Sequence, residues 1–373
     1  MESFLGFITS CLITLCATPF VVRFAHRFNL IDDPDKRSHP ANTHKGILPR
    51  AGGLAIYLGI IVSSFFFLPI EKHLLGIFTG ITVLLIMGLL DDRLVKFSPY
   101  TRLLLLLAPA AAAVASGIGI SFISNPLQAI PNLPAIWQPA VIRLDQIVLI
   151  FDFLGPHKII LLADIFAFLW IITLTQVVNW SKGVDGQMPG ITLVAAITLG
   201  IYSLKLYGQG DINQLSVAKL SFITAGASLG FLIVNWHPAK ILPGFSASTI
   251  LAFMLAVLSI LSGPKVTIAF LVLAIPIADF IYTLCRRTLA GKSPFWGDRG
   301  HLHHRLLDIL GWSPQQISLF YILGSAILGA VALLASTAGK IIAIILALVF
   351  FIGLIVWLNF FGDFSKRSGR DNG

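Results

Sequence analysis

The chain has 373 residues, of which 56% are hydrophobic and only 12% are charged, and its mean hydropathy is +0.88. Soluble domains carry about 25% charged residues, so this composition excludes an ordinary soluble globule and also a disordered chain. Since lipid is then the solvent for most of the chain, the net charge of +9 bears on membrane orientation, and nucleic acid is not an expected partner.

Eleven apolar runs are read as membrane-spanning helices, because about 20 apolar residues cross a hydrocarbon core of about 30 Å. They fall near residues 3–25, 51–70, 74–90, 102–121, 159–178, 190–207, 217–235, 247–262, 266–285, 317–337 and 340–361. Some are short, so the count is ten or eleven. The sequence predicts an all-α polytopic membrane protein of about 11 transmembrane helices, with one transmembrane domain over 1–362 and a polar cytoplasmic tail over 363–373.

The distribution of basic residues predicts the orientation. With the N-terminus outside, 19 of the 26 lysine and arginine residues fall on inner segments or at the inner ends of the adjoining spans, which is the positive-inside pattern. The long outer segment 117–158 contains five prolines and alternates in hydropathy over 141–145. A small external β-ribbon is therefore expected within 118–158.

Two adjacent carboxylates, Asp91 and Asp92, stand at the inner end of the third predicted span. This end of a helix is the negative end of its dipole, so two anions there require a cation. A divalent metal would satisfy them. The alternative is a solvated helix end that Arg93 and Lys96 neutralise.

A glycine-containing segment, 179–186, follows the fifth predicted span. Its two glycines allow backbone N–H groups to approach an anion, while Asn179 and Asp185 offer the oxygen ligands that Mg²⁺ prefers. The alternative is a plain reversal between two spans.

Three histidines, His301, His303 and His304, lie in a polar segment after the ninth predicted span. The same segment contains three cations: Lys292, Arg299 and Arg305. These cations would oppose a zinc ion, so an anionic ligand such as a diphosphate is the better interpretation. The alternative is a basic loop that rests on anionic lipid headgroups.

The first inner loop combines Lys45 and Arg50 with the glycine pair Gly52-Gly53 at a predicted helix start. Positive charge at a helix start suits a phosphate near the bilayer surface, although topology signals have the same appearance. Asp279 lies inside the ninth predicted span. An intramembrane carboxylate indicates either function or a structural hydrogen bond within the bundle.

Taken in this order, the segments resemble the polyprenyl-phosphate N-acetylhexosamine-1-phosphate transferases of glycosyltransferase family 4, which include undecaprenyl-phosphate GlcNAc-1-phosphate transferase and phospho-N-acetylmuramoyl-pentapeptide transferase. The resemblance covers about residues 20 to 310. Its motif residues are Asp32, Pro34, Arg37, His39, Pro49, Arg50, Gly52, Gly53, Asp91, Asp92, Asp279 and the segment 298–306.

Two positions depart from the family pattern. Lys182 stands where the family usually has a carboxylate, and Phe245 stands where it has the aspartate that is a main magnesium ligand. A lysine can neutralise a phosphate, whereas the loss of a metal ligand weakens Mg²⁺ binding.

The resemblance implies transfer of a sugar-1-phosphate, with GlcNAc-1-phosphate as the default, from a UDP-sugar to undecaprenyl or another polyprenyl phosphate, releasing UMP for cell-wall or surface polysaccharide synthesis. Catalysis would take place at the cytoplasmic face of the bacterial inner membrane with Mg²⁺, or Mn²⁺ in its place, and a homodimer is possible. The implied catalytic residues are Asp91, Asp92 and Asp185; the metal ligands are Asn179 and Asp185; the substrate-binding residues are Lys45, Arg50, Lys182, Arg299, His301, His303 and His304.

Two other classes are considered. A catalytically impaired homologue that binds lipid phosphate or UDP-sugar as a scaffold or regulator would tolerate Phe245, but would have little need of the adjacent carboxylates. A secondary transporter would place ionisable groups near the midplane of paired halves, whereas here most of them gather at one face. The sequence leaves open the sugar, the polyprenol length and the pathway.

Overall fold

A computed structural model describes residues 1–34, 46–94, 98–125, 141–152, 156–261, 266–294 and 297–368. Its helices are α1 (Glu2–Arg27), α2 (Gly52–Phe67), α3 (Lys72–Arg93), α4 (Pro99–Leu105), α5 (Leu107–Ala115), α6 (Leu161–Trp180), α7 (Gln187–Gly208), α8 (Gln214–Asn235), α9 (Gly244–Leu261), α10 (Val266–Val272), α11 (Ala274–Leu289), α12 (Leu302–Leu310), α13 (Pro314–Leu334) and α14 (Thr337–Ser368).

The described strands form three antiparallel pairs. They are β1 (Ile31–Asp32) with β2 (Leu48–Pro49), β3 (Phe122–Ser124) with β4 (Val141–Arg143), and β5 (Val148–Asp152) with β6 (Pro156–Ile160). The last two pairs confirm the β-structure expected within 118–158, and β6 ends two residues beyond that segment.

The all-α polytopic fold class is confirmed. Among the described residues, eight helices are long and apolar enough to cross a membrane, and a ninth span results if α10 and α11, which are bent by 81° relative to each other, count as one. The α2 helix and the α4–α5 pair are shorter. Each of the eleven predicted runs corresponds to one long helix, to the shorter α2, or to a broken pair (α4–α5 or α10–α11). Whether the shorter and broken helices cross the membrane is not established, so the count of about 11 stays a prediction. The last helix, α14, continues to Ser368, past the predicted domain boundary at 362.

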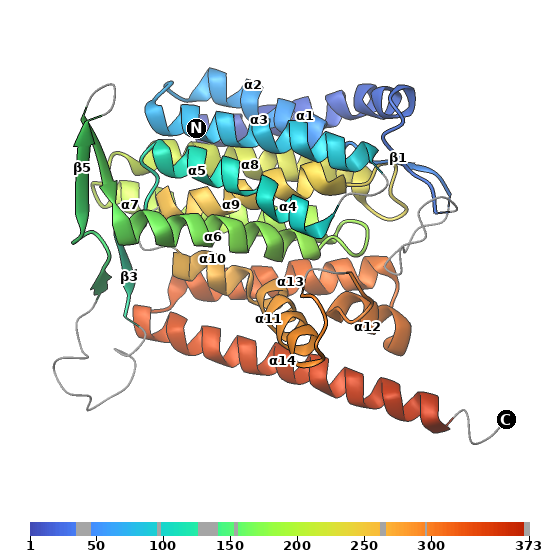
Figure 1. The fold of residues 1–373 in the computed structure, drawn as a ribbon. Coiled ribbons are helices and arrows are strands. Elements are labelled where there is room, and N and C mark those ends of the chain that lie inside the picture. Colours follow the sequence, from blue (N-terminus) through green and yellow to red (C-terminus); the bar gives the residue numbers. More distant parts are fainter. Residues whose placement is uncertain are drawn as a thin grey trace, which may run out of the picture.

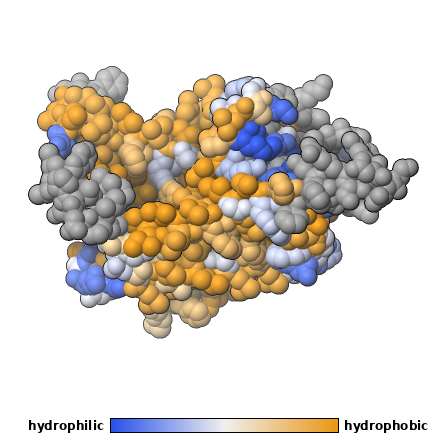
Figure 2. Space-filling model, turned by 90° about the horizontal axis from the view of Figure 1, so that it is seen from below, coloured by the Kyte–Doolittle hydropathy of each residue, from blue (hydrophilic) through white to orange (hydrophobic). Residues whose placement is uncertain are grey.

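The long helices lie side by side in a bundle with two distinct ends. In Figure 1, strands β3 and β5 lie at one end, whereas β1, α12 and the end of α14 lie at the other. Figure 2 shows hydrophobic residues over the middle of one face and hydrophilic residues toward its ends. Large side chains such as Phe66, Leu334 and Phe360 are more than two-thirds exposed, as suits a surface that lipid covers.

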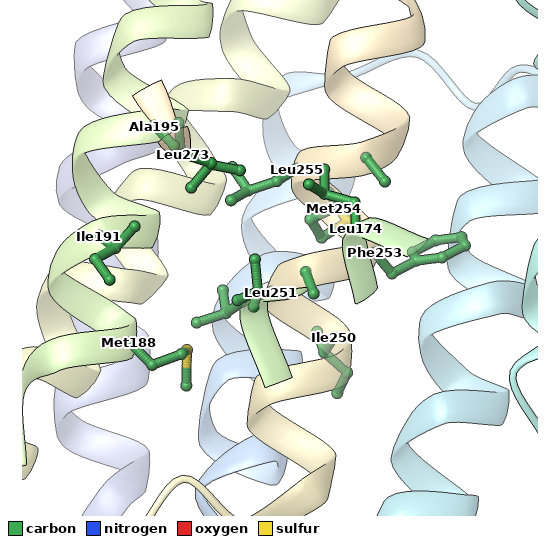
Figure 3. Packing of buried hydrophobic residues seen from close by; sticks show 14 of the residues in the cluster. Leu174, Met188, Ile191, Ala195, Ile250, Leu251, Phe253, Met254, Leu255 and Leu273 are labelled. Carbon is green, nitrogen blue, oxygen red and sulfur yellow. The ribbon is translucent and has the colours of Figure 1, made fainter. Parts of the chain in front are cut away.

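The central helix of the bundle is α9. In its apolar stretch of 18 residues 94% of the residues are buried, against 28% in the corresponding stretch of α1. Figure 3 shows Leu251 and Leu255 of α9 beside Met188 and Ile191 of α7, with Leu174 of α6 nearby. Because α9 contacts helices on several sides, the position of its N-terminus determines which loops can meet at that end of the bundle.

Helix α8 packs on α1 through small residues. A Cβ atom at Gly226 would lie 2.1 Å from the carbonyl oxygen of Phe7, and one at Gly230 would lie 2.5 Å from that of Cys11. Two glycines four residues apart let helix backbones approach closely in a membrane, where packing rather than the hydrophobic effect holds helices together.

We expect Gly226→Ala to destabilise the protein by about 1 to 3 kcal/mol, the usual cost of overpacking, because backbone atoms rather than a movable side chain oppose the new methyl group. The measurement is the thermal unfolding midpoint in detergent. Gly353→Ala is the matched control, since a Cβ atom at this position of α14 would meet nothing within 4 Å. Equal midpoints for the two variants would contradict close α1–α8 packing.

Candidate functional site

The carboxylate of Asp92 binds the first turn of α9. Its Oδ1 accepts a hydrogen bond from the backbone N–H of Phe245 at 2.7 Å, and its Oδ2 accepts from Ser246 Oγ at 2.8 Å and from Ser246 N at 3.3 Å. The first N–H groups of a helix lack intrahelical partners and form its positive end. Asp92 is fully buried, so it acts as the anionic cap of the central helix.

Glycines allow this approach. A Cβ atom at Gly88 would lie 2.4 Å from Cα of Ser246, and one at Gly53 would lie 2.5 Å from its Cβ. Gly244 has a φ of +66°, and a Cβ atom there would lie 2.4 Å from Asp92 Oδ2. Gly53 was predicted to belong to a phosphate-binding helix start, but in the structure its Cα is packed against α9.

Two arginines neutralise the acidic pair. Arg50 Nε lies 3.1 Å from Asp92 Oδ1, and its Nη1 lies 3.2 Å from Asp32 Oδ2. Arg102 Nε lies 2.6 Å from Asp91 Oδ1. The alternative interpretation had assigned this task to Arg93 and Lys96. Arg93 is exposed, and residue 96 lies outside the described residues.

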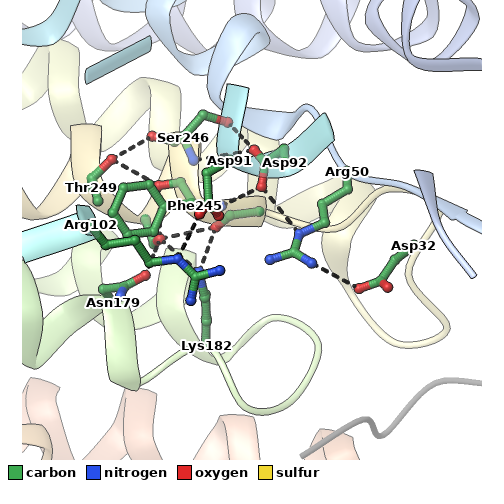
Figure 4. A network of polar contacts seen from close by, with 12 residues as sticks. Asp32, Arg50, Asp91, Asp92, Arg102, Asn179, Lys182, Phe245, Ser246 and Thr249 are labelled. Carbon is green, nitrogen blue, oxygen red and sulfur yellow. Dashed lines mark hydrogen bonds and ion pairs between the residues drawn. The ribbon is translucent and has the colours of Figure 1, made fainter. Parts of the chain in front are cut away.

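Lys182 is held on the same cluster. Its Nζ donates to the carbonyl oxygen of Gly244 at 2.9 Å and to Ser248 Oγ at 3.2 Å, and Ser248 Oγ donates to Asn179 Oδ1 at 2.8 Å. Figure 4 shows these side chains together with both arginines and the acidic pair. The pKa of Lys182 is lowered to about 7. The main cause is removal of the ammonium from solvent, and the second is repulsion from Arg50.

The two departures from the family pattern are neighbours. Lys182 Nζ lies 5.5 Å from the centroid of the Phe245 ring, and Arg102 Cζ lies 5.8 Å from it. The ring is 2% exposed and presents π-electron density to both cations. Lys182 and Phe245 thus form one local arrangement, which their positions in the sequence do not indicate.

Asp185 has different partners. Its Oδ2 lies 2.7 Å from His237 Nδ1 and accepts a hydrogen bond from the backbone N–H of Ala239 at 3.2 Å. Asn235 Oδ1 accepts from the N–H of Gly186 at 3.0 Å. These bonds attach the loop between α6 and α7 to the connection between α8 and α9.

The donors present do not fit a metal centre. Within the described ranges, no group of three or more histidine, cysteine or acidic side chains is placed to hold a metal ion. The predicted ligands Asn179 and Asp185 have separate partners, and the acidic pair is bound to arginines. A magnesium ion stays a prediction from the sequence.

Asp279 positions the histidine segment. Its Oδ2 lies 2.9 Å from His301 Nδ1, and its Oδ1 accepts from the backbone N–H of Leu302 at the start of α12. Arg287 Nη2 lies 3.3 Å from His301 Nε2. Of the two interpretations of Asp279, the structure shows the structural hydrogen bonds within the bundle. One of its partners, His301, is a predicted site residue.

The C-terminal end of α6 joins the two clusters. Asn179 is bonded to Ser248, whereas the next residue, Trp180, packs edge-on against His301 at 5.6 Å and lies under Arg287 at 5.0 Å. A Cβ atom at Gly183 would lie 1.8 Å from His303 Nε2, so this loop touches the histidine segment directly.

His303 and His304 are buried and uncharged near neutral pH. Burial is the main cause that lowers the pKa of His303 well below its usual value and that of His304 to about 4. Their Nδ1 atoms have no hydrogen-bond partner among the described residues. These imidazoles can direct hydrogen bonds to a ligand but supply no charge.

The remaining predicted site residues differ in placement. Arg299 forms an exposed ion pair with Asp308 at 2.7 Å, and Lys45 lies outside the described residues. The prediction did not include several residues that hold the site together: Arg102, Trp180, His237, Ser246, Ser248 and Arg287.

The fold and this polar end define a multi-pass membrane protein with a buried network of carboxylates and cations at one end of a helical bundle. Residues 74–263 match the family described as Glycosyl transferase family 4, and the chain belongs to this family.

Three relatives cover most of the chain. A probable undecaprenyl-phosphate N-acetylglucosaminyl 1-phosphate transferase of Bacillus subtilis (strain 168) is 26% identical, over 94% of this chain and 90% of the relative. A decaprenyl-phosphate N-acetylglucosaminephosphotransferase of Mycobacterium tuberculosis (strain H37Rv) is 29% identical, over 84% and 77%. An undecaprenyl-phosphate alpha-N-acetylglucosaminyl 1-phosphate transferase of Escherichia coli (strain K12) is 25% identical, over 85% and 79%.

We expect Asp92→Asn to destabilise the protein by roughly 3 to 5 kcal/mol, because it leaves Arg50 without its buried partner at the start of α9. Asp91→Asn should cost roughly 1 kcal/mol, since Arg102 is one-third exposed. Thermal unfolding midpoints in one detergent measure both changes, with Arg93→Gln as an exposed neighbouring control. The idea of a capping role is wrong if the two carboxylate variants unfold at the same temperature.

The Lys182 pKa predicts a pH dependence. With a pKa of about 7 in the folded state against 10.5 ordinarily, Lys182 binds fewer protons when folded than when unfolded between these values. Stability from this group therefore rises with pH across that window and is constant below it. The difference in unfolding midpoint between the wild type and Lys182→Met should change in favour of the wild type from pH 7 to 10. A constant difference would contradict the lowered pKa.

Proposed function

We propose that the protein transfers a sugar-1-phosphate, with GlcNAc-1-phosphate as the first candidate, from a UDP-sugar to polyprenyl phosphate at the cytoplasmic face of the membrane. Its family and the names of its relatives support this activity. The observation that carries it is the α6 end, where Asn179 reaches the acidic pair's cluster and Trp180 reaches the histidine segment.

In the proposed reaction, an oxygen of the lipid phosphate attacks the β-phosphorus of the UDP-sugar. The bond from that phosphorus to the bridging oxygen breaks, UMP leaves with this oxygen, and the lipid carries the sugar on a diphosphate. Such transfer depends mainly on positioning and on stabilisation of charge. A phosphate is already largely ionised at neutral pH, so a general base contributes little.

The residues of this chain then have separate tasks. Arg50, Arg102 and Lys182 face negative phosphoryl oxygens, and Asp92 and Asp91 orient the two arginines. The neutral imidazoles of His303 and His304 donate hydrogen bonds to the sugar or diphosphate.

Phe245 favours a second candidate, a catalytically impaired homologue that binds the same ligands. A ring at this position cannot supply the oxygen ligand that the family pattern has there. The two candidates differ in turnover and not in binding.

We expect the purified protein to release UMP and form a lipid-linked sugar when supplied with undecaprenyl phosphate, a divalent cation and a panel of UDP-sugars. Arg102→Gln should lower the rate about 10²- to 10³-fold, the usual effect of removing one group that stabilises developing charge. Arg93→Gln, which changes an exposed arginine nearby, is the control. Binding of a UDP-sugar without turnover by any member of the panel would favour the impaired homologue.

A further inference from the structure

With Lys182 protonated, the charges of the described side chains around the acidic pair balance without any added ion. Its carboxylates are those of Asp32, Asp91 and Asp92, and its cations are those of Arg50, Arg102 and Lys182. The other side chains labelled in Figure 4, which are Asn179, Phe245, Ser246 and Thr249, carry no charge. A divalent cation placed here would meet two arginines that are already paired with the described carboxylates, and a lysine held by the Gly244 carbonyl oxygen and Ser248 Oγ.

The charges are arranged in layers. The carboxylate side chains are at most 9% exposed, whereas those of Arg50 and Arg102 are 18% and 35% exposed. Lys182 is half-buried. A ligand that approaches from solvent therefore meets the cations first, and the carboxylates lie behind them.

The cations keep unused hydrogen-bond donors. An ammonium group has three N–H donors and a guanidinium has five, yet the described residues take two from Lys182, two from Arg50 and one from Arg102. Phosphate oxygens are the acceptors that several such donors recognise together.

The Lys182 ammonium has a fixed position. The Gly244 carbonyl and Ser248 Oγ hold Nζ in place, and the buried Phe245 ring lies beside it. A lysine held in this way provides a positive charge at a fixed position. No ion has to be taken from solution and immobilised when the ligand binds.

We propose that Arg50, Arg102 and Lys182 form a cationic site that binds the phosphate or diphosphate group of a substrate without a divalent metal ion, with Lys182 as its built-in cation. The site rests on the proposed function for its ligands, which are the UDP-sugar and the lipid phosphate. It differs from that function in making a claim about metal dependence.

The test measures binding by the full-length protein, stripped of metal, in detergent. UDP-GlcNAc and undecaprenyl phosphate are titrated separately, each in EDTA and in excess Mg²⁺. The Kd of at least one ligand should change less than about twofold between the two conditions. A Kd that improves tenfold or more with Mg²⁺ for both ligands would overturn the proposal without any variant.

The matched variants are Lys182→Met and Lys240→Met, since Lys240 is an exposed lysine of the neighbouring loop. Loss of a charged hydrogen-bonding group should weaken binding about 10- to 100-fold in the first variant and leave it unchanged in the second. A loss confined to UDP-GlcNAc identifies the diphosphate as the bound group, and one confined to undecaprenyl phosphate identifies the lipid. Unchanged affinity for both ligands in a folded Lys182→Met protein overturns the proposal.

The double variant Lys182→Asp/Phe245→Asp reverses the charge of the site. We expect it to lose binding in EDTA and to regain it with Mg²⁺, as seen by the same titrations and by direct titration of Mg²⁺ into the ligand-free protein. Wild-type binding that is independent of metal, combined with no sugar transfer, would contradict the proposed function while leaving this inference intact.

Discussion

The bond between Asp92 and the first turn of α9 is the interaction on which the polar end of the molecule depends. A central helix that begins among packed helices exposes N–H groups that have no partner inside the helix and little access to water. Asp92 satisfies them, but a buried carboxylate is itself costly unless a cation pairs with it. Arg50 supplies that cation and is bonded in turn to Asp32. One unsatisfied helix end thus organises residues from four separate parts of the chain.

The same constraint explains why the glycines are where they are. Asp92 reaches α9 only because Gly88 and Gly53 leave no side chain between their helices and Ser246. Of these two glycines, only Gly53 was predicted to belong to a phosphate-binding helix start. In the structure both are packing positions against Ser246, and they let Asp92 and its partner Arg50 reach the start of α9.

The sequence predicted the elements and missed the partners. Apolar runs of about 20 residues predicted the spans because lipid leaves the backbone little choice but a helix. The break at Leu106 between α4 and α5 and the bend between α10 and α11 depend on packing, so composition did not reveal them. The acidic pair was recognisable as a charge problem, but its solution was not, since exposed Arg93 is adjacent in sequence while Arg102 makes the bond.

Contacts between distant positions were the other gap. Lys182 and Phe245 are 63 positions apart and looked like two independent losses of a carboxylate. In the structure the Lys182 ammonium lies beside the Phe245 ring, so the two substitutions affect the same part of the site. Comparison with the family pattern treats each substitution separately. The electrostatic effect depends on the total change in charge from both substitutions, because the two side chains lie together. That sum is a gain of positive charge at a point where carboxylates were expected.

Fixed cations beside uncharged histidines suit a reaction whose substrates and products are all phosphate esters. A site with more positive charge would bind substrates and products more tightly by similar amounts, which does not accelerate the chemical step. His303 and His304 are neutral near pH 7 because burial disfavours their cationic form. They can therefore orient a ligand through directed hydrogen bonds while adding nothing to the charge that retains it. The proposed tasks are thus divided between three basic side chains near the start of α9, which would hold a diphosphate by charge, and the imidazoles of α12, which would orient it by hydrogen bonds.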